Sequence, residues 1–88
     1  MSYEIELRKA GFDRYMFKID DSDLMKKEHK HRGSMYRIQA DLKKGTVEVY
    51  NTVNGIYVLS KHSIELEELI NAKCDLDYLM KRTVDKKC

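Results

Sequence analysis

The stretch that decides the fold is Thr46-Val47-Glu48-Val49-Tyr50-Asn51-Thr52-Val53-Asn54-Gly55-Ile56-Tyr57-Val58-Leu59-Ser60. A type I′ turn needs positive φ at both central residues, and Asn followed by Gly tolerates this best. Asn54-Gly55 therefore predicts a two-residue turn that joins two strands into a β-hairpin. This turn also predicts the register, in which Val53 pairs with Ile56, Thr52 with Tyr57, Asn51 with Val58, Tyr50 with Leu59 and Val49 with Ser60.

The predicted register divides the hairpin into two faces. We expect the valine-rich face to be core, and its members are Val47, Val49, Val53, Ile56 and Val58. The opposite face carries an aromatic and aliphatic patch of Tyr50, Tyr57 and Leu59, beside Thr46, Glu48 and Thr52. Such a patch is covered by a helix, paired with a second chain, or used for binding. Because a helix over 63–73 has one apolar stripe, we expect it to cover the valine face and to leave the patch for a partner.

Three further segments alternate apolar and polar residues with the period of a half-buried strand. These segments are 3–8, 14–19 and 35–42, and the first two are expected to pair as a hairpin through Lys9-Ala10-Gly11. Together with 46–53 and 56–60 they predict five strands with local connections. Such strands favour a mostly antiparallel sheet.

Two regions are expected to be helical. A short, mostly polar helix is predicted from Asp23 to His31, with Gly33 ending it, because side-chain acceptors precede it. A second helix is predicted over 63–73 with Ser63 as its N-cap, and Asp75 is expected to cap a third, in which Leu76, Leu79 and Met80 form one stripe. The expected architecture is a single α+β domain, 1–88, in ββαβββα order, with one or two helices on one face of a five-stranded sheet and a flexible tail over 83–88.

The composition is that of a globular protein, with 42% hydrophobic and 36% charged residues among 88. No apolar run approaches the roughly 18 residues of a membrane-spanning helix. The first residues lack the basic and apolar segments of a secretory signal, so we expect a cytoplasmic protein. Cys74 and Cys88 are too few for a disulfide scaffold and are expected to be free thiols.

The charges are unevenly distributed along the chain. Residues 24–44 hold seven bases and two acids, whereas 65–77 holds five acids and one base. The basic segment 26–37 is the candidate nucleic-acid site, because its bases can contact phosphates and its tyrosine can stack on a base. Its site residues would be Lys26, Lys27, Lys30, Arg32, Tyr36 and Arg37. The alternative is a solvated basic turn.

The sequence lacks a recognisable metal or catalytic motif. Glu28, His29 and His31 do not have the i, i+4 histidine spacing of a helical metal pair, and zinc sites usually show two short-spaced ligand pairs. His62 and Cys74 would have to complete such a site, so we expect no metal and no cofactor. Ser63 as a helix cap and Cys74 as a small buried side chain explain these two residues without catalysis.

These observations favour a non-enzymatic protein. We expect a small regulatory or inhibitory binding protein that acts on a macromolecular protein partner, of the size common in phages and mobile elements. Its binding residues would be Tyr50, Tyr57 and Leu59, with the acidic C-terminal helix as another surface, and self-association is one form of this interaction. The alternative is a nucleic-acid-binding protein that uses residues 26–37.

Overall fold

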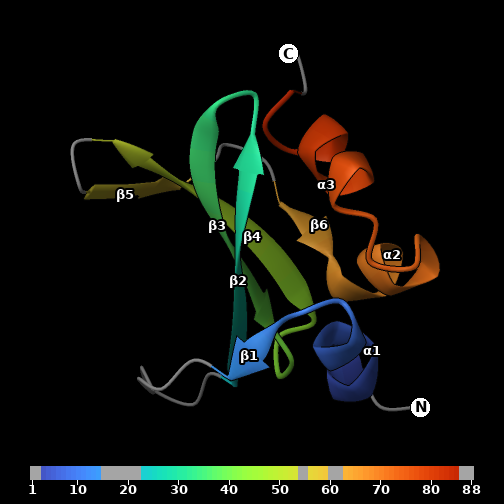
Figure 1. The fold of residues 1–88 in the computed structure, drawn as a ribbon. Helices are drawn as coiled ribbons and strands as arrows, with labels where there is room; N and C mark the ends of the chain where they lie inside the picture. Colours follow the sequence, from blue (N-terminus) through green and yellow to red (C-terminus); the bar gives the residue numbers. More distant parts are fainter. Residues whose placement is uncertain (1–2, 15–22, 54–55, 60–62, 86–88) are drawn as a thin grey trace.

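The computed structural model describes residues 3–14, 23–53, 56–59 and 63–85. The helices are α1 (Tyr3–Lys9), α2 (Leu66–Asn71) and α3 (Leu76–Arg82), and the strands are β1 (Asp13–Arg14), β2 (Leu24–His31), β3 (Ser34–Asp41), β4 (Thr46–Val53), β5 (Ile56–Leu59) and β6 (Ile64–Glu65). The expected α+β class with an antiparallel sheet is confirmed (Figure 1). None of the helices in these ranges has the length and apolar character needed to cross a membrane.

The sheet has the strand order β1-β2-β3-β4-β5, and every pairing in it is antiparallel. The short strand β6 pairs with the beginning of β4, at Thr46↔Glu65 and Val47↔Ile64. The register of β4 and β5 is the one predicted from Asn54-Gly55, from Val53↔Ile56 to Tyr50↔Leu59. Asn54, Gly55 and Ser60 themselves lie outside the described residues.

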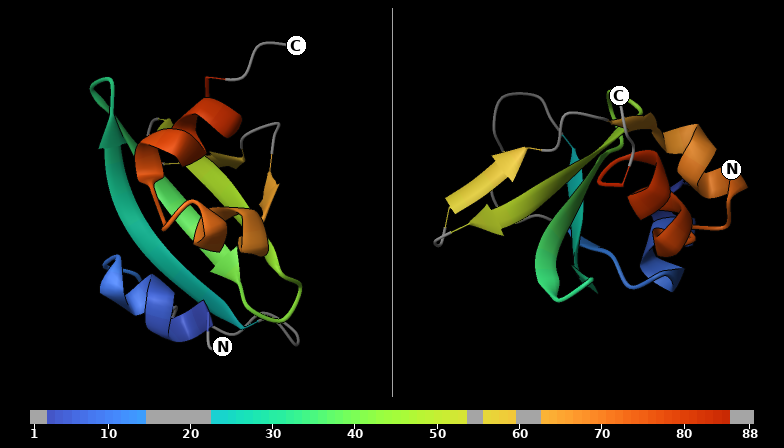
Figure 2. Two further views of the ribbon diagram at one scale, coloured as in Figure 1. Left: turned by 90° about the vertical axis from the view of Figure 1, so that its right-hand side faces the viewer. Right: turned by 90° about the horizontal axis from the view of Figure 1, so that it is seen from above.

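All three helices lie on the same side of the sheet (Figure 2). The core between them holds Leu7 of α1, Leu66 and Leu69 of α2, Leu79 and Met80 of α3, and from the strands and loops Phe12, Met25, Tyr36, Ile38, Ala40, Val47, Val49 and Ile64. The expectation that the second helix covers the valine face is confirmed for Val47 and Val49, which are fully buried. It is wrong for Ile56, which is 67% exposed, because the end of the β4–β5 hairpin projects beyond the helices (Figure 1).

The strand expected over 3–8 is wrong, because this segment forms α1. Acidic residues occupy its first turn and basic residues its last, as the helix dipole favours. The Arg8 Nε atom donates to Glu4 Oε2 at 2.9 Å across one turn. The helix buries Leu7 completely and leaves Ile5 55% exposed, whereas a strand would place both on one face. Of the strand expected over 14–19, Arg14 belongs to β1 and the remainder lies outside the described residues.

The helix expected from Asp23 to His31 is also wrong, because residues 24–31 form β2. This strand pairs with β3 along its full length, from Leu24↔Asp41 to His31↔Ser34. Arg32 and Gly33 form the connecting turn with φ of 51° and 81°, the positive values that a two-residue hairpin turn requires. Gly33 is therefore a turn residue and not a helix end.

The helix α2 begins later than expected, whereas α3 begins where it was predicted. Ser63 is exposed and does not cap α2, whose N-cap is Glu65, because Ile64 and Glu65 first pair with β4. The predicted cap of α3 is confirmed: Asp75 accepts hydrogen bonds from the backbone N–H groups of Asp77 and Tyr78. The tail expected over 83–88 is packed at its start, since Thr83 is buried and its hydroxyl donates to the Leu79 carbonyl at 2.7 Å.

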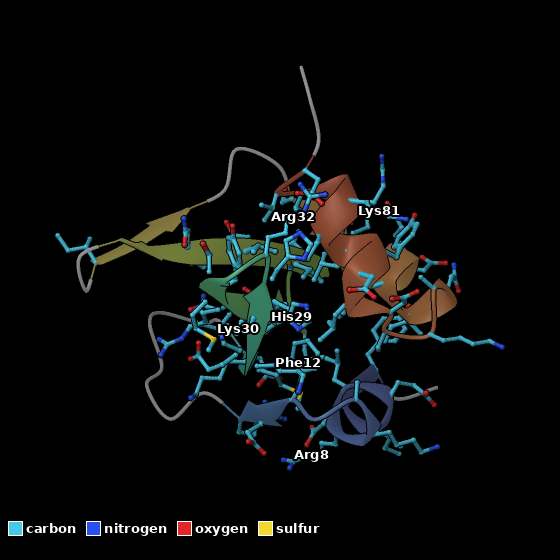
Figure 3. All side chains as sticks on the ribbon, turned by 45° about the horizontal axis from the view of Figure 1, so that its top comes forward. Arg8, Phe12, His29, Lys30, Arg32 and Lys81 are labelled. Atoms are coloured by element: carbon cyan, nitrogen blue, oxygen red, sulfur yellow. The ribbon has the colours of Figure 1, made fainter. Side chains whose placement is uncertain are left out.

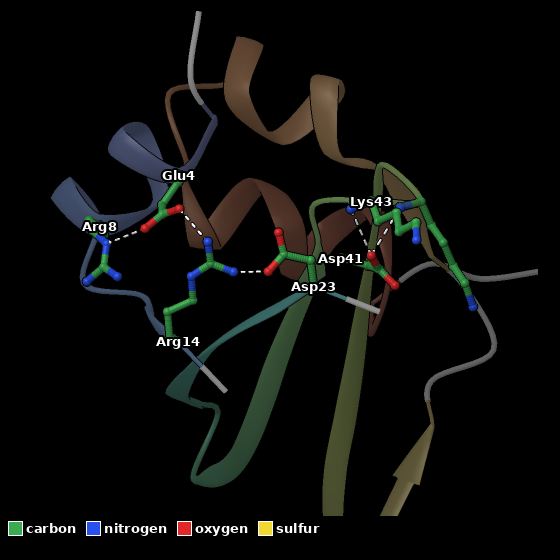
Figure 4. A network of polar contacts seen from close by, with 7 residues as sticks. Glu4, Arg8, Arg14, Asp23, Asp41 and Lys43 are labelled. Carbon is green, nitrogen blue, oxygen red and sulfur yellow. Dashed lines mark hydrogen bonds and ion pairs between the residues drawn. The ribbon is translucent and has the colours of Figure 1, made fainter. Parts of the chain in front are cut away.

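Two groups of polar contacts lie at the ends of the strands (Figure 4). Arg14 bridges Glu4 of α1, at 2.6 Å, and Asp23, which precedes β2. Asp23 was expected to begin a helix, and its carboxylate pairs with Arg14 instead. Asp41 is buried in the β3–β4 turn, where its Oδ1 accepts from the backbone N–H groups of Lys43 and Lys44 at 2.9 and 3.0 Å.

Candidate protein-binding face of the sheet

The sheet has one face against the helices and one face that no described helix covers. On β2, Met25 is buried in the core, so the residues that alternate with it point to the other side. Tyr36 on β3 and Val47 on β4 are likewise buried, so the residues that alternate with them also point away from the helices. We call this side of the sheet the open face. Its positions are Lys26, Glu28, Lys30, Met35, Arg37, Gln39, Glu48 and Tyr50, with positions 57 and 59 placed there by the β4–β5 register.

A row of paired positions crosses the middle of the open face. Glu28 pairs with Arg37, Arg37 with Tyr50, and Tyr50 with Leu59, on four successive strands. The Arg37 Nε atom donates to Glu28 Oε1 at 3.0 Å, and the Arg37 side chain is 17% exposed. The structure therefore pairs Tyr50 with Arg37, which the sequence analysis placed in two different candidate sites, and the register places position 59 beside Tyr50.

Met35 adds an apolar side chain to this face. It is 46% exposed and pairs with Lys30 on the adjoining strand. Met35 was not among the expected binding residues. The signal was present, because Met35 alternates with Tyr36 and Ile38 and so belongs with Arg37 rather than with the core.

The open face carries both signs of charge. Lys26, Lys30 and Arg37 are interleaved with Glu28 and Glu48. A nucleic-acid backbone laid across this face would meet both carboxylates, and repulsion between like charges opposes that contact. A surface with both charges, an aromatic residue and a methionine suits a protein partner better.

The residues of the candidate nucleic-acid segment do not share one surface. Lys27 lies on the helix side of β2. Its Nζ lies against Gly11, where a side-chain Cβ atom would be only 2.8 Å away from it. Tyr36 is 9% exposed and packs in the core, so its ring is not available for stacking on a base. Arg32 lies on the β2–β3 turn and is 75% exposed. The alternation of β2 and β3 separates these bases, whereas the sequence had grouped them.

The acidic C-terminal region forms a shallow groove, which is lined by Glu65, Glu67, Glu68, Asn71, Ala72 and Tyr78. Its central carboxylate is already engaged within the protein. Glu68 Oε2 accepts from the Tyr78 hydroxyl at 2.6 Å and from Arg82 Nε at 2.8 Å. This hydrogen bond to the Glu68 carboxylate raises the pKa of Tyr78.

The candidate nucleophile Cys74 has the environment of a structural thiol. Burial, and next the nearby charge of Glu6, raise its pKa, which disfavours the reactive thiolate. Its Sγ lies 3.9 Å from the Glu6 carbonyl oxygen. Of the other residues considered for catalysis, Ser63 is exposed and His62 lies outside the described residues.

Comparisons of the chain with family models, with curated proteins and with solved structures gave no match.

Proposed function

We propose that the protein is a small, non-enzymatic regulatory protein of the cytoplasm that binds another protein through the open face of its sheet. The observation that carries this proposal is the one-sided arrangement of the fold. All three helices lie on the side of the sheet that holds Val47 and Val49, and none of the described ones covers Glu28, Arg37 and Tyr50.

The residue types on the open face support a protein partner. Tyrosine, arginine and methionine are enriched in the centres of protein interfaces, where they supply contact area and charge-assisted hydrogen bonds. The Arg37 guanidinium is held by Glu28 and is therefore already oriented before a partner binds. Because paired strands carry these positions, the partner would meet a surface that needs little ordering.

The experiment compares two exposed apolar residues on different surfaces. Met35, 46% exposed, lies on the open face, and Ile5, 55% exposed, lies on α1. Wild type, Met35→Glu and Ile5→Glu are used to capture proteins from a lysate of the organism that encodes the chain. We expect one protein to be retained by wild type and Ile5→Glu and to be at least about tenfold depleted with Met35→Glu, because a charge buried in an interface is unfavourable.

Three controls separate this proposal from its alternatives. Circular dichroism checks that both variants remain folded. Light scattering of the purified protein reports whether the partner is a second copy of the chain. Nuclease treatment and a salt titration identify binding to nucleic acid, which weakens steeply with salt. Equal capture by the two glutamate variants, or binding only to nucleic acid, would show that the open face is not a protein-binding surface.

A further inference from the structure

The two histidines of β2 lie on the side of the sheet that faces the helices. His29 and His31 are two residues apart, so a strand places both on one face. Lys30 between them lies on the opposite side of the strand (Figure 3). A spacing of two residues does not fit a metal-binding pair on a helix, but on a strand it places the two imidazoles side by side.

A carboxylate from α3 completes a group of three metal-binding side chains. Ligand atoms of His29, His31 and Asp77 all lie within 4.8 Å of one another. Four-coordinate zinc has metal–ligand bonds of about 2.0–2.2 Å, which separates neighbouring ligand atoms by about 3.3–3.5 Å. Asp77 is exposed, so a change of its side-chain rotamer can close the remaining distance.

His29 supplies an independent observation that points to a ligand. Its Nε2 atom is buried and has no hydrogen-bond partner in the described part of the chain. A buried polar atom without a partner carries a desolvation cost, and native structures rarely leave one unexplained. A bound cation would satisfy this nitrogen through its lone pair.

His31 has the second contact that metal-binding histidines usually have. Its Nε2 lies 3.1 Å from Asp85 Oδ2, and both side chains are largely buried, at 15% and 19% exposed. A carboxylate on one ring nitrogen selects the tautomer and leaves the other nitrogen for the metal. Asp85 Oδ2 also lies 3.4 Å from Nη2 of the exposed Arg32 side chain.

We propose that His29, His31 and Asp77 form a binding site for a divalent transition metal ion of the zinc type, with Asp85 as a positioning residue for His31. Two imidazoles and one carboxylate are ligands that zinc accepts, and the fourth position would be open to water. The ion would connect the end of the β2–β3 hairpin to α3. The site is independent of the open face, because its histidines lie on the other side of β2.

The first test is a titration of the tag-free protein with Zn²⁺, followed by calorimetry, with Mg²⁺ as the comparison ion. We expect saturable binding of one Zn²⁺ per chain, a higher melting temperature with Zn²⁺, and no binding of Mg²⁺, which prefers oxygen ligands. In NMR spectra, the imidazole signals of both His29 and His31 should shift on addition of Zn²⁺. This measurement needs no variant, so it stands even if a substitution impairs folding.

The second test uses variants of the proposed ligands and of Asp85. His29→Gln, His31→Gln and Asp77→Asn should each lower zinc affinity by more than about 100-fold, and Asp85→Asn by about 10–100-fold, the range found for outer-shell partners. Glu28→Gln is the matched control, because Glu28 adjoins His29 and lies on the opposite face, paired with Arg37. Absence of saturable binding, or an equal loss in Glu28→Gln and His31→Gln, would overturn the site. Unchanged affinity in Asp85→Asn would overturn the positioning role.

Discussion

The rings of His29 and His31 stack on the helix-facing side of β2, with their centroids 6.4 Å apart and their planes at 22°. The Tyr36 ring of β3 lies beside His31 in an edge-to-face arrangement, with centroids 6.2 Å apart and planes at 60°. This cluster exists because the Arg32-Gly33 turn pairs His31 with Ser34 and so sets His29 opposite Tyr36. The turn therefore determines both the proposed metal site and the separation of the basic residues into two faces.

Replacement of the first turn residue should stabilise the protein. Arg32 has a φ of 51°, a conformation that costs an ordinary L-residue roughly 1–2 kcal/mol and that Asn tolerates better. We expect Arg32→Asn to raise the free energy of unfolding by about 1 kcal/mol, measured by urea denaturation. The Arg32 side of its ion pair with Asp85 is exposed, so loss of this pair should lower the free energy of unfolding only slightly. Arg32→Val should lower stability, and a loss of stability in Arg32→Asn would contradict this account of the turn.

Two apolar residues of α1 should respond very differently to truncation. Leu7 is fully buried, so Leu7→Ala should lower the free energy of unfolding by about 2–5 kcal/mol. Ile5 is 55% exposed, and Ile5→Ala should change it by no more than about 0.5 kcal/mol. Chemical denaturation of the two variants measures both effects. Similar losses in both would mean that residues 3–9 form a strand with Ile5 and Leu7 on one face.

Acid should remove the contribution of Glu4. Hydrogen bonds from Arg8 and next from Arg14 hold the pKa of Glu4 below its ordinary value of 4.5. A carboxyl group with a lowered folded-state pKa adds stability above its unfolded-state pKa and loses it as pH falls through the folded-state pKa. Wild type should therefore be more stable than Glu4→Gln near neutral pH. The difference should begin to shrink as the pH falls to the ordinary pKa of 4.5 and should vanish below the lowered folded-state pKa. A difference that does not change with pH would show that the ion pairs of Glu4 contribute nothing.

The thiol of Cys74 should react slowly in the folded protein. Burial and the Glu6 charge raise its pKa, and alkylation proceeds through the thiolate. In the single-thiol variant Cys88→Ser, we expect modification by iodoacetamide at slightly alkaline pH to be several-fold slower in buffer than in denaturing urea. Mass spectrometry follows the product. Equal rates under both conditions would show that the thiol is accessible and would reopen a chemical role for Cys74.

Local signals in the sequence were sufficient wherever a turn or cap had a strong preference of its own. Asn54-Gly55 predicted the β4–β5 register, and the residue pairs found from Val53↔Ile56 to Tyr50↔Leu59 are the predicted ones. Asp75 predicted the start of α3, because a side-chain acceptor before a helix satisfies backbone N–H groups whatever surrounds it. The alternation over 35–42 likewise predicted β3, since Tyr36, Ile38 and Ala40 are all buried.

Tertiary pairing decided the remaining elements. Residues 24–31 have weak apolar periodicity, and their strand conformation is stabilised by hydrogen bonding to β3 along the full length of that strand. Tyr3, Ile5 and Leu7 alternate like a strand, but Leu7 is buried and Tyr3 packs against the core while Ile5 is 55% exposed. The ion pairs of Glu4 with Arg8 and Arg14 also favour the helix. The proposed metal group combines side chains of β2 and α3. His31 and Asp77 are 46 residues apart in the sequence. Sequence spacing alone could not bring them together, because the distance between side chains on separate elements is set by how those elements pack.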